Sequence, residues 1–380
     1  MSIKERLIHI KWKHYAAYIA VALVMLIFGV ISKGLPASIC YLLEKTAIAM
    51  ILAVSLSLVV GFLGELSLGH AGFMCVGAYL GGKTALLLQP VIGNDLLVLL
   101  IALIVGGAAA GVCGFIIGLP ALRLKGDYLA ITTLAFGEIV RTIFQNTSDD
   151  SFGGALGLQT GAIRYDRREL FLICFAVLLL TIAVIQNLIR SKHGRAITAI
   201  RDNEIAARAT GINVTYYKLT GFVVAAIFAG LAGVLFAHTQ NVQSLTFDYN
   251  YSIEILVMVV LGGMGSLNGS LIAAALITYL NEKLGVLLMG DLAVLKDLVY
   301  ALILILLVIY NNAPALSSFR EKYNLKNLFK RLRRGKAARG DADDTGRWDV
   351  VPTKIKMDAL LSTDFVVTEI KADKPKEDGK

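Results

Sequence analysis

The sequence predicts an all-α integral membrane protein, a polytopic bundle of about ten transmembrane or half-spanning helices. Hydrophobic residues make up 56% of the 380 residues, charged residues only 17%, and the mean hydropathy is +0.69. Soluble domains carry about 25% charged residues. The apolar residues also stand in blocks that match the about 20 residues of a spanning helix. Water is therefore not the main solvent of this chain.

The apolar blocks define the expected spans. The first is taken as an uncleaved span and not as a secretory signal, because further blocks follow it. The candidate spans are 16–32, 46–63, 69–88, 96–118, 128–145, 170–189, 218–240, 252–267, 269–289 and 292–310.

Two glycine-rich pairs of these spans break in the middle. The pairs 46–88 and 252–289 break near Gly64 and Gly265, which predicts re-entrant or half-helical segments there. An offset of about 200 residues aligns 61–80 with 261–280, a faint sign of internal duplication.

The distribution of Lys and Arg predicts the orientation. The net charge is +9, but the basic residues gather between apolar blocks, as in loops held on the cytoplasmic side. This placement explains the charge without a nucleic acid partner. With the amino end inside, the loops 119–127 and 190–217 and the carboxyl end are cytoplasmic. The outer side keeps few basic residues, Lys45 and Lys83 among them.

Three regions follow from this topology. Residues 1–15 form a cytoplasmic segment, 16–310 the membrane domain with the loop 190–217, and 311–380 a basic and charged tail, partly disordered. The basic part of the tail is suited to anionic membrane lipid. The expected location is the cytoplasmic (inner) membrane, with both ends in the cytoplasm.

One motif in the sequence is misleading. Gly77, Gly82, Lys83 and Thr84 match the phosphate-loop pattern, but that loop needs a preceding strand in a soluble sheet domain, and this copy lies in an apolar run. Neither a catalytic constellation nor a metal-ligand pattern is found in the sequence, including around its four cysteines, Cys40, Cys75, Cys113 and Cys174. The chain is therefore expected to be no enzyme and to hold no cofactor or metal.

Glycines at small-xxx-small spacing are expected to bring helix backbones together in lipid. The pairs are Gly77 and Gly81, Gly107 and Gly111, Gly114 and Gly118, and Gly265 and Gly269.

Polar residues in the membrane segments are candidates for a substrate pathway. A charge at the bilayer centre costs about 2.5 to 3.5 kcal/mol on insertion scales, so it must face protein or water. Glu138 and Arg141 stand one helical turn apart and can pair. An ion pair without a substrate role is an equally good interpretation. The candidate pathway or gating residues are Ser67, Gly69, His70, Glu138, Arg141, Glu254, Gly262, Gly263 and Gly265.

The loop between the sixth and seventh spans predicts a helix of about two turns. Asp202 or Asn203 can cap its start, Glu204 favours the first turn, Arg208 the last, and Gly211 the left-handed residue beyond the end. Such a short helix can seat in a groove of another protein and transmit motion, although an ordinary amphipathic loop helix has the same pattern. Its residues are Arg201, Asp202, Asn203, Glu204, Ala206, Ala207 and Gly211.

This loop resembles the cytoplasmic coupling motif of ABC importer permeases, E-A-A followed by Gly. Here Glu204, Ala206, Ala207 and Gly211 match it, and Ile205 replaces the first Ala. Further segments, in order along the chain, resemble the LivM-type permease subunits of branched-chain amino acid ABC importers. They are 66–71, 134–141, 194–196, 199–204, 211–214 and 259–266.

The resemblance implies a permease subunit that forms half of a translocation pathway for branched-chain or other hydrophobic amino acids. Implied partners are a LivH-like sister permease, two ABC ATPase subunits (LivG/LivF-like) that carry ATP and Mg²⁺, and a periplasmic or lipid-anchored substrate-binding protein. Similar permeases carry urea or short amides, so the substrate stays open. An ion-coupled secondary carrier that uses Glu138 and Glu254 is the alternative from another class.

Overall fold

The computed structural model describes residues 36–124, 126–163, 165 and 167–287, and residues 299, 301, 302 and 305. The chain divides into two units, Met1–Asn312 and Ala313–Lys380, and every described residue lies in the first. The predicted segments 1–15, 16–32 and 311–380, and most of 292–310, lie outside the described residues.

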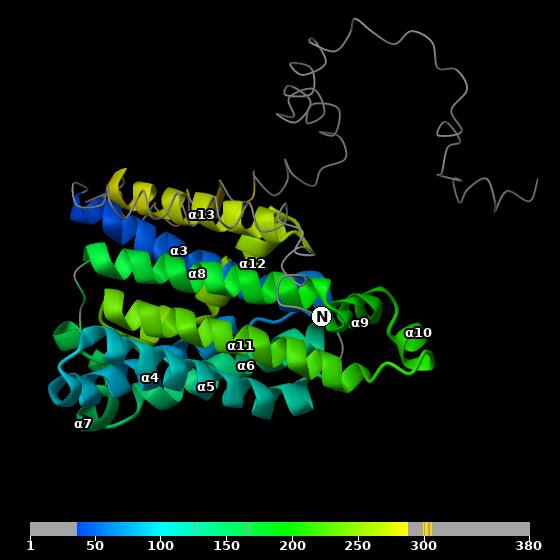
Figure 1. Cartoon of the computed structure of the whole chain (residues 1–380), viewed down its shortest axis with the longest axis horizontal. Helices are drawn as coiled ribbons and strands as arrows, with labels where there is room; N and C mark the ends of the chain where they lie inside the picture. The colour runs from blue at the N-terminus through cyan, green and yellow to red at the C-terminus, as the bar shows by residue number, and fades with distance from the viewer. Residues whose placement is uncertain are drawn as a thin grey trace, which may run out of the picture. The chain divides into compact units, whose positions relative to one another are not determined.

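The described part is a bundle of long helices with two short helices at one end (Figure 1). Within it no strand occurs, only an isolated bridge between Leu158 and Val242, so the all-α class is confirmed. The helices are α3 (Ala37–Ser57), continued by the π-helical turn η2 (Leu58–Leu63), α4 (His70–Ile92), α5 (Asp95–Ala121), α6 (Asp127–Gln145), α7 (Asp149–Phe152), α8 (Arg167–Arg190), α9 (Lys192–Asp202), α10 (Glu204–Ala209), α11 (Val214–Thr239), α12 (Tyr249–Gly262) and α13 (Leu267–Leu287), with 3₁₀ turns η3 (Gly154–Leu156), η4 (Gly161–Ile163) and η5 (Ser244–Phe247).

Five of the described helices are long and apolar enough to cross a membrane: Ala37–Leu63, His70–Ile92, Asp95–Ala121, Glu169–Arg190 and Val214–Thr239. The helices α6 and α13, of 19 and 21 residues, carry charged side chains and are not among them. The apolar helix α12 has 14 residues and is about 21 Å long, less than the roughly 30 Å of a hydrocarbon core. It is a half-spanning helix, as the sequence predicts for this region.

Glycines bring α4, α5 and α11 into close contact. A Cβ atom added to Gly77 of α4 would lie 2.2 Å from the carbonyl oxygen of Gly230 in α11. The predicted pair Gly107 and Gly111 of α5 faces Leu231 and Ile227 of α11. Small residues therefore let these backbones approach, as predicted from their spacing.

Both predicted helix breaks are present. The η2 turn ends at Leu63, the next residue, Gly64, has a φ of +79°, and residues 64–69 are irregular until α4 begins at His70. The helix α12 ends at Gly262, and Gly263 and Gly265 have φ of +92° and +84°. These φ values favour glycine.

The two breaks, about 200 residues apart in the chain, touch each other. A Cβ atom added to Gly61 would lie 2.6 Å from the backbone nitrogen of Gly265. The two glycine-rich breaks thus form one junction of irregular backbone, which is partly exposed.

The apparent phosphate-loop residues lie inside a helix. Gly77, Gly82, Lys83 and Thr84 belong to α4, where the Thr84 hydroxyl donates to the Leu80 carbonyl at 2.7 Å. Lys45, assigned above to an outer loop, also lies in a helix, because α3 begins at Ala37 and not near residue 46. The apolar pattern alone missed the first turns of α3, since they carry Glu44 and Lys45.

Candidate functional site

The loop between α8 and α11 folds into two short helices. Ser191 begins α9 by accepting hydrogen bonds from the backbone N–H groups of His193 and Gly194 at 3.1 and 3.3 Å. Sequence reasoning missed this helix, although Ser191 with the buried Ile197 and Ile200 forms an N-cap and an apolar helical spacing.

The second short helix, α10, lies where the sequence predicts a two-turn helix. Asn203 is extended (φ −158°, ψ 104°), and its side-chain oxygen accepts from the Ala206 N–H at 3.0 Å. Asn203 is therefore the cap, and Asp202 belongs to α9. Gly211 has a φ of +85°, the left-handed conformation expected beyond the helix end.

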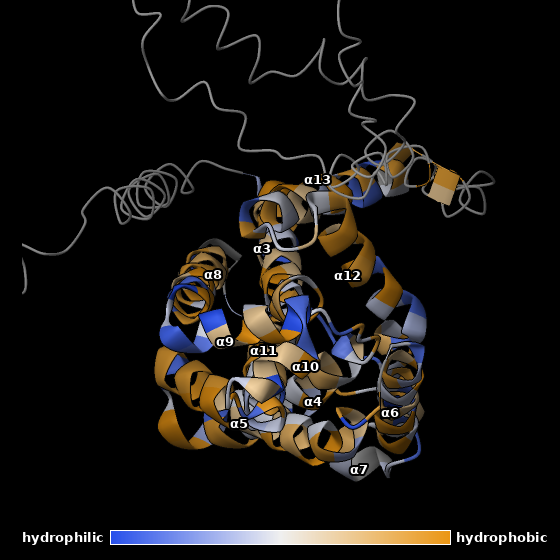
Figure 2. Cartoon of the chain, turned by 90° about the vertical axis from the view of Figure 1, so that its right-hand side faces the viewer, coloured by the Kyte–Doolittle hydropathy of each residue, from blue (hydrophilic) through white to orange (hydrophobic). Residues whose placement is uncertain are grey.

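One face of α10 is buried and the other is open. Ala207 is buried with Ile200 and Val214, whereas Ile205 is 80% exposed. Hydrophilic residues gather on α9 and beside α10, while the long helices behind them are mostly apolar (Figure 2). An exposed large apolar side chain on a short helix is a feature of docking surfaces, although a single such residue is common.

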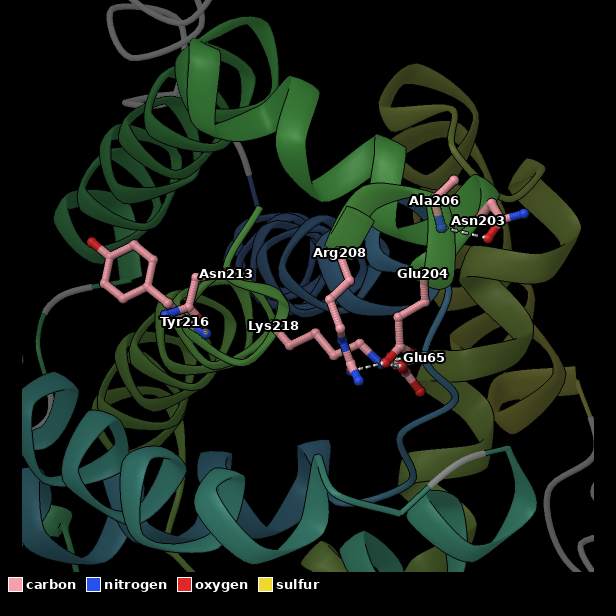
Figure 3. A network of polar contacts seen from close by, with 8 residues as sticks. All are labelled: Glu65, Asn203, Glu204, Ala206, Arg208, Asn213, Tyr216 and Lys218. Atoms are coloured by element: carbon pink, nitrogen blue, oxygen red, sulfur yellow. Dashed lines mark hydrogen bonds and ion pairs between the residues drawn. The ribbon is translucent and has the colours of Figure 1, made fainter. Parts of the chain in front are cut away.

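A buried lysine connects α10 to the first break (Figure 3). Lys218, in α11, is 4% exposed. Its ammonium donates to Glu65, in the irregular segment after η2, and to Glu204 of α10 at 3.2 Å. Glu204 also accepts from Arg208 at 2.9 Å. Two carboxylates and two cations offset each other, as buried charges require.

An arginine connects α9 to both breaks. The guanidinium of Arg201 donates to the carbonyl of Gly61 at 3.0 Å and to Asp202 at 2.9 and 3.1 Å. A Cβ atom on Gly64 would lie 2.6 Å from the Arg201 Cγ, and one on Gly265 would lie 3.6 Å from its Nη1. The carbonyls of a last helical turn lack partners within the helix, and Arg201 supplies one for Gly61. Arg201, which the sequence assigned to the two-turn helix, lies in α9, and it is α9 that contacts Gly265 of the predicted pathway set.

Ser67, Gly69 and His70 lie in tight packing after the first break. His70 is 1% exposed, and its Nε2 lies 2.8 Å from the Ser55 hydroxyl. A Cβ atom on Gly69 would lie 2.6 Å from the Thr133 carbonyl oxygen of α6. The Ser67 hydroxyl is buried and has no hydrogen-bond partner in the described part of the chain. The role of these residues in a pathway stays a prediction.

Glu138 and Arg141 form the predicted ion pair, with 2.8 Å between Glu138 Oε2 and Arg141 Nη2. The second oxygen of Glu138 accepts from the backbone N–H of Tyr249, the first residue of α12, at 3.0 Å. A carboxylate at a helix N-terminus satisfies a free N–H and stabilises the helix dipole. The pair holds α12 against α6, which favours its interpretation as a structural pair.

Glu254 lines a cavity of about 150 Å³ between α3, α11, α12 and α13. Its Oε1 accepts from the Asn281 side chain at 3.2 Å. The same cavity contains a pair that sequence reasoning missed, Lys45 and Glu282, whose charged atoms lie 2.5 Å apart. Lys45 and Lys218 stand at the starts of the apolar blocks 46–63 and 218–240, and Glu282 lies within the block 269–289, two turns from its end. A search for charges near both ends of each block would have found all three.

At the second break, Gly262 of α12 packs directly against Gly269 of α13. A Cβ atom on Gly269 would lie 1.8 Å from the Gly262 carbonyl oxygen, so α12 and α13 pack backbone against backbone where the chain reverses. Any side chain at either position would separate the two helices.

Comparisons with known proteins give the relationship of the chain. Residues 38–309 match the family model "Branched-chain amino acid transport system / permease component". The high-affinity branched-chain amino acid transport system permease protein LivM of Escherichia coli K12 is 35% identical over 317 residues, covering 74% of this chain and 71% of that one. The ribose import permease protein RbsC of the same strain is 26% identical over 293 residues, covering 71% and 84%. A probable LivH permease of Methanocaldococcus jannaschii is 28% identical over 203 residues, covering 53% and 58%.

Proposed function

This chain belongs to the branched-chain amino acid permease family of ABC transporters, and we propose on that premise that it couples one half of an amino acid pathway to ATPases. The substrates are Leu, Ile, Val and other hydrophobic amino acids. The partners are a LivH-like sister permease, two LivG/LivF-like ATPase subunits and a periplasmic or lipid-anchored binding protein. ATP and Mg²⁺ act on the ATPases, and this chain holds no cofactor.

The contact of the α9–α10 element with the two helix breaks carries this proposal. Arg201 of α9 binds the Gly61 carbonyl and lies against Gly265. Lys218 of α11 bridges Glu204 of α10 and Glu65, which follows the first break. Irregular backbone inside a membrane protein is tolerated where it lines a cavity or is buried in protein. A displacement of α10 by a partner therefore reaches the places where the spans are interrupted.

The orientation follows from charge. The α10 end carries the basic loop 190–217 and is placed in the cytoplasm, facing the ATPases, with the membrane being the inner one. The opposite end, with α7 and η3, then faces the binding protein.

Two alternatives to this proposal are an ion-coupled secondary carrier and an importer of a different substrate. A secondary carrier would need titratable acids open to water. Glu138 is bound to both Arg141 and the start of α12, which argues against it as such an acid, whereas Glu254 lines a cavity, so the requirement for ATPases decides between the two functions. The chain is also similar to a ribose permease, and similar permeases carry urea or short amides. The substrate is therefore tested by direct uptake measurements.

Proteoliposomes that contain this chain, the sister permease and the two ATPases test the proposal. With binding protein outside and ATP inside, uptake of labelled leucine is expected, and unlabelled isoleucine and valine should compete while ribose and urea should not. Uptake by this chain with an ion gradient and no ATPases would contradict the proposal, as would competition by ribose or urea alone.

Two variants test the coupling role of α10 in the same system. Glu204→Lys places a cation beside Lys218 and Arg208, so we expect leucine uptake to fall at least about tenfold while the assembled complex can still be purified. Gly211→Val strains a left-handed position by about 1 to 2 kcal/mol, while a Cβ atom there meets nothing within 4 Å, so its main effect is expected on the backbone.

Gly211→Asn is the matched control, because Asn tolerates this conformation. Unchanged uptake and unchanged stimulation of ATP hydrolysis in both Glu204→Lys and Gly211→Val would rule out the assigned role of α10.

A further inference from the structure

We propose that the outer face of α6 is this chain's wall of the substrate pathway, and that a groove on this face contacts the amino acid in passage. Ile139 and Ile143 meet its aliphatic side chain, and Thr142 and Asn146 meet its ammonium group. The inference rests on the proposed function for the substrate class, and on the exposed residues of α6 for the place.

The groove lies at the depth of a membrane span. A Cβ atom on Gly72 of α4 would lie 2.7 Å from the Cα atom of Gly137 in α6. Further along the two helices, the rings of Tyr79 and Phe144 stack with 4.3 Å between their centres. This stretch of α6 therefore runs beside α4 within one of the five candidate spans. Side chains on its outer face meet lipid, protein or water.

The outer face of α6 is polar as well as apolar. Ile131, Ile139 and Ile143 are 59 to 63% exposed, and Thr142 and Asn146 are exposed beside them. Residues four apart are neighbours on a helix surface, so Ile139 and Ile143 form an apolar column, and Thr142 and Asn146 form a polar one. The two columns run side by side along one face.

The outer face of α5 is different. Its exposed residues between positions 100 and 120 are all apolar, among them Ile104 at 71% and Ile116 at 59%. Such a face suits lipid, which offers no hydrogen-bond partner. The face of α6 carries the polar column and the Glu138–Arg141 pair, and charged side chains at membrane depth face protein or water. The two faces therefore have different surroundings.

α12 lies beside α6 on the same side of the bundle (Figure 2), and its backbone also needs a neighbour other than lipid. α12 begins at Tyr249, whose N–H binds Glu138, and ends after 14 residues at Gly262. The irregular residues 263–266 follow it and lie beside Gly61, within a candidate span. Irregular backbone in a membrane protein is tolerated only where protein covers it or water reaches it. This side of the bundle is therefore suited to a pathway that the sister permease closes.

The groove can hold an amino acid. Its volume is about 440 Å³, and small-molecule sites measure about 300 to 1,000 Å³. The charge of Glu138 is balanced by Arg141, which suits a zwitterion whose net charge is zero. The lining residues are Glu138, Ile139, Thr142, Ile143 and Asn146.

The polar side chains of the groove are bonded within α6 and still carry acceptor atoms. The Thr142 hydroxyl donates to the Glu138 carbonyl at 2.8 Å, and the Asn146 side-chain nitrogen donates to the Thr142 carbonyl at 2.8 Å. A hydroxyl oxygen and an amide oxygen have lone pairs for further bonds, so both can accept from an ammonium group. Contacts of this kind are weak enough for a substrate to leave again, as conduction requires.

Cysteine accessibility tests this wall in proteoliposomes that contain both permeases and the ATPases. The variants are Thr142→Cys and Asn146→Cys in the groove and, as the matched control, Ile104→Cys on the apolar face of α5. The unmodified chain gives the background of the native cysteines. A charged methanethiosulfonate reacts with the thiolate, which forms in water and not in lipid, so both groove variants should react at least about tenfold faster than the control.

The same reaction tests whether the wall belongs to the pathway. After treatment, ATP-driven leucine uptake should fall at least about tenfold relative to the same groove variant before treatment, because a fixed charge then stands in the passage. Treated Ile104→Cys should keep its uptake.

Reaction of the two groove variants no faster than that of Ile104→Cys would place the face against lipid or a tightly packed neighbour and would overturn the inference. Fast reaction without loss of uptake would overturn it as well, because the face would then be wet but off the pathway. If the unmodified complex takes up leucine in either case, the proposed function stands; if it takes up none, the proposed function itself fails.

Discussion

At the residue scale, Lys218 is the side chain that contributes most to the stability of the charge network at α10. It is 4% exposed and holds the carboxylates of Glu65 and Glu204 together. Arg208, the other cation of this network, has a side chain that is 69% exposed. The two basic residues differ in burial and therefore in what their loss costs.

We expect Lys218→Met to destabilise the purified protein by about 3 kcal/mol, because removing one partner of a buried ion pair leaves charge without compensation. The measurement is the midpoint of thermal unfolding in detergent, followed by size-exclusion chromatography. Lys218→Arg should recover part of the loss.

Arg208→Met is the matched control for this prediction. It removes an exposed pair at i,i+4 spacing and should cost less than about 0.5 kcal/mol. Equal unfolding midpoints for Lys218→Met and Arg208→Met would show that burial does not set the strength of this network.

Helix packing at the element scale depends on glycines of α4, α5 and α11. In lipid there is little hydrophobic gain when two helices meet, so close contact of backbones provides the stabilisation. Where α4 crosses α11, a Cβ atom on Gly77 would lie 2.2 Å from the Gly230 carbonyl oxygen, and one on Gly233 would lie 2.0 Å from the Met74 carbonyl oxygen.

Gly77→Val should therefore separate α4 from α11 and cost at least about 3 kcal/mol. The expected result is little assembled protein in the membrane, measured by fluorescence-detected chromatography. Gly161→Ala serves as the control, because a Cβ atom there meets nothing within 4 Å, and it should leave the yield unchanged. Normal yield of Gly77→Val would show that the two helices are farther apart than described.

Local sequence patterns predicted the helices and their interruptions well. Apolar length predicted the five described helices that are long and apolar enough to cross a membrane. Glycine clusters predicted the breaks at Gly64 and Gly265. Both features depend on residues close in the chain. Asn203, Glu204 and Gly211 likewise gave α10 through capping chemistry.

Contacts between distant segments could not be predicted in this way. The sequence shows that Glu138 and Arg141 are one turn apart, but not that Glu138 binds the N–H of Tyr249. It gives no sign that Arg201 reaches Gly61, or that Lys45 meets Glu282. These contacts depend on how the helices pack, which a single sequence does not state.

At the scale of the whole bundle, one chain of contacts joins its two ends. It begins at α10, passes through Lys218 and Arg201 to the junction of the two breaks, and continues along α12 to the cavity with Glu254. This chain of contacts gives an otherwise inert membrane bundle a way to respond to a partner that binds at α10.

Coupling through α10 requires α10 to face the ATPase side of the membrane, and cysteine labelling tests this directly. Ile205 is 80% exposed on α10, and Leu156 is 74% exposed in η3 at the opposite end. Of the native cysteines, Cys40, Cys75 and Cys174 are buried and Cys113 is half-buried, and the unmodified chain measures their background. A membrane-impermeant maleimide should label Ile205→Cys in inside-out vesicles and not in right-side-out vesicles, with the reverse for Leu156→Cys. Labelling of Ile205→Cys in right-side-out vesicles would contradict the account.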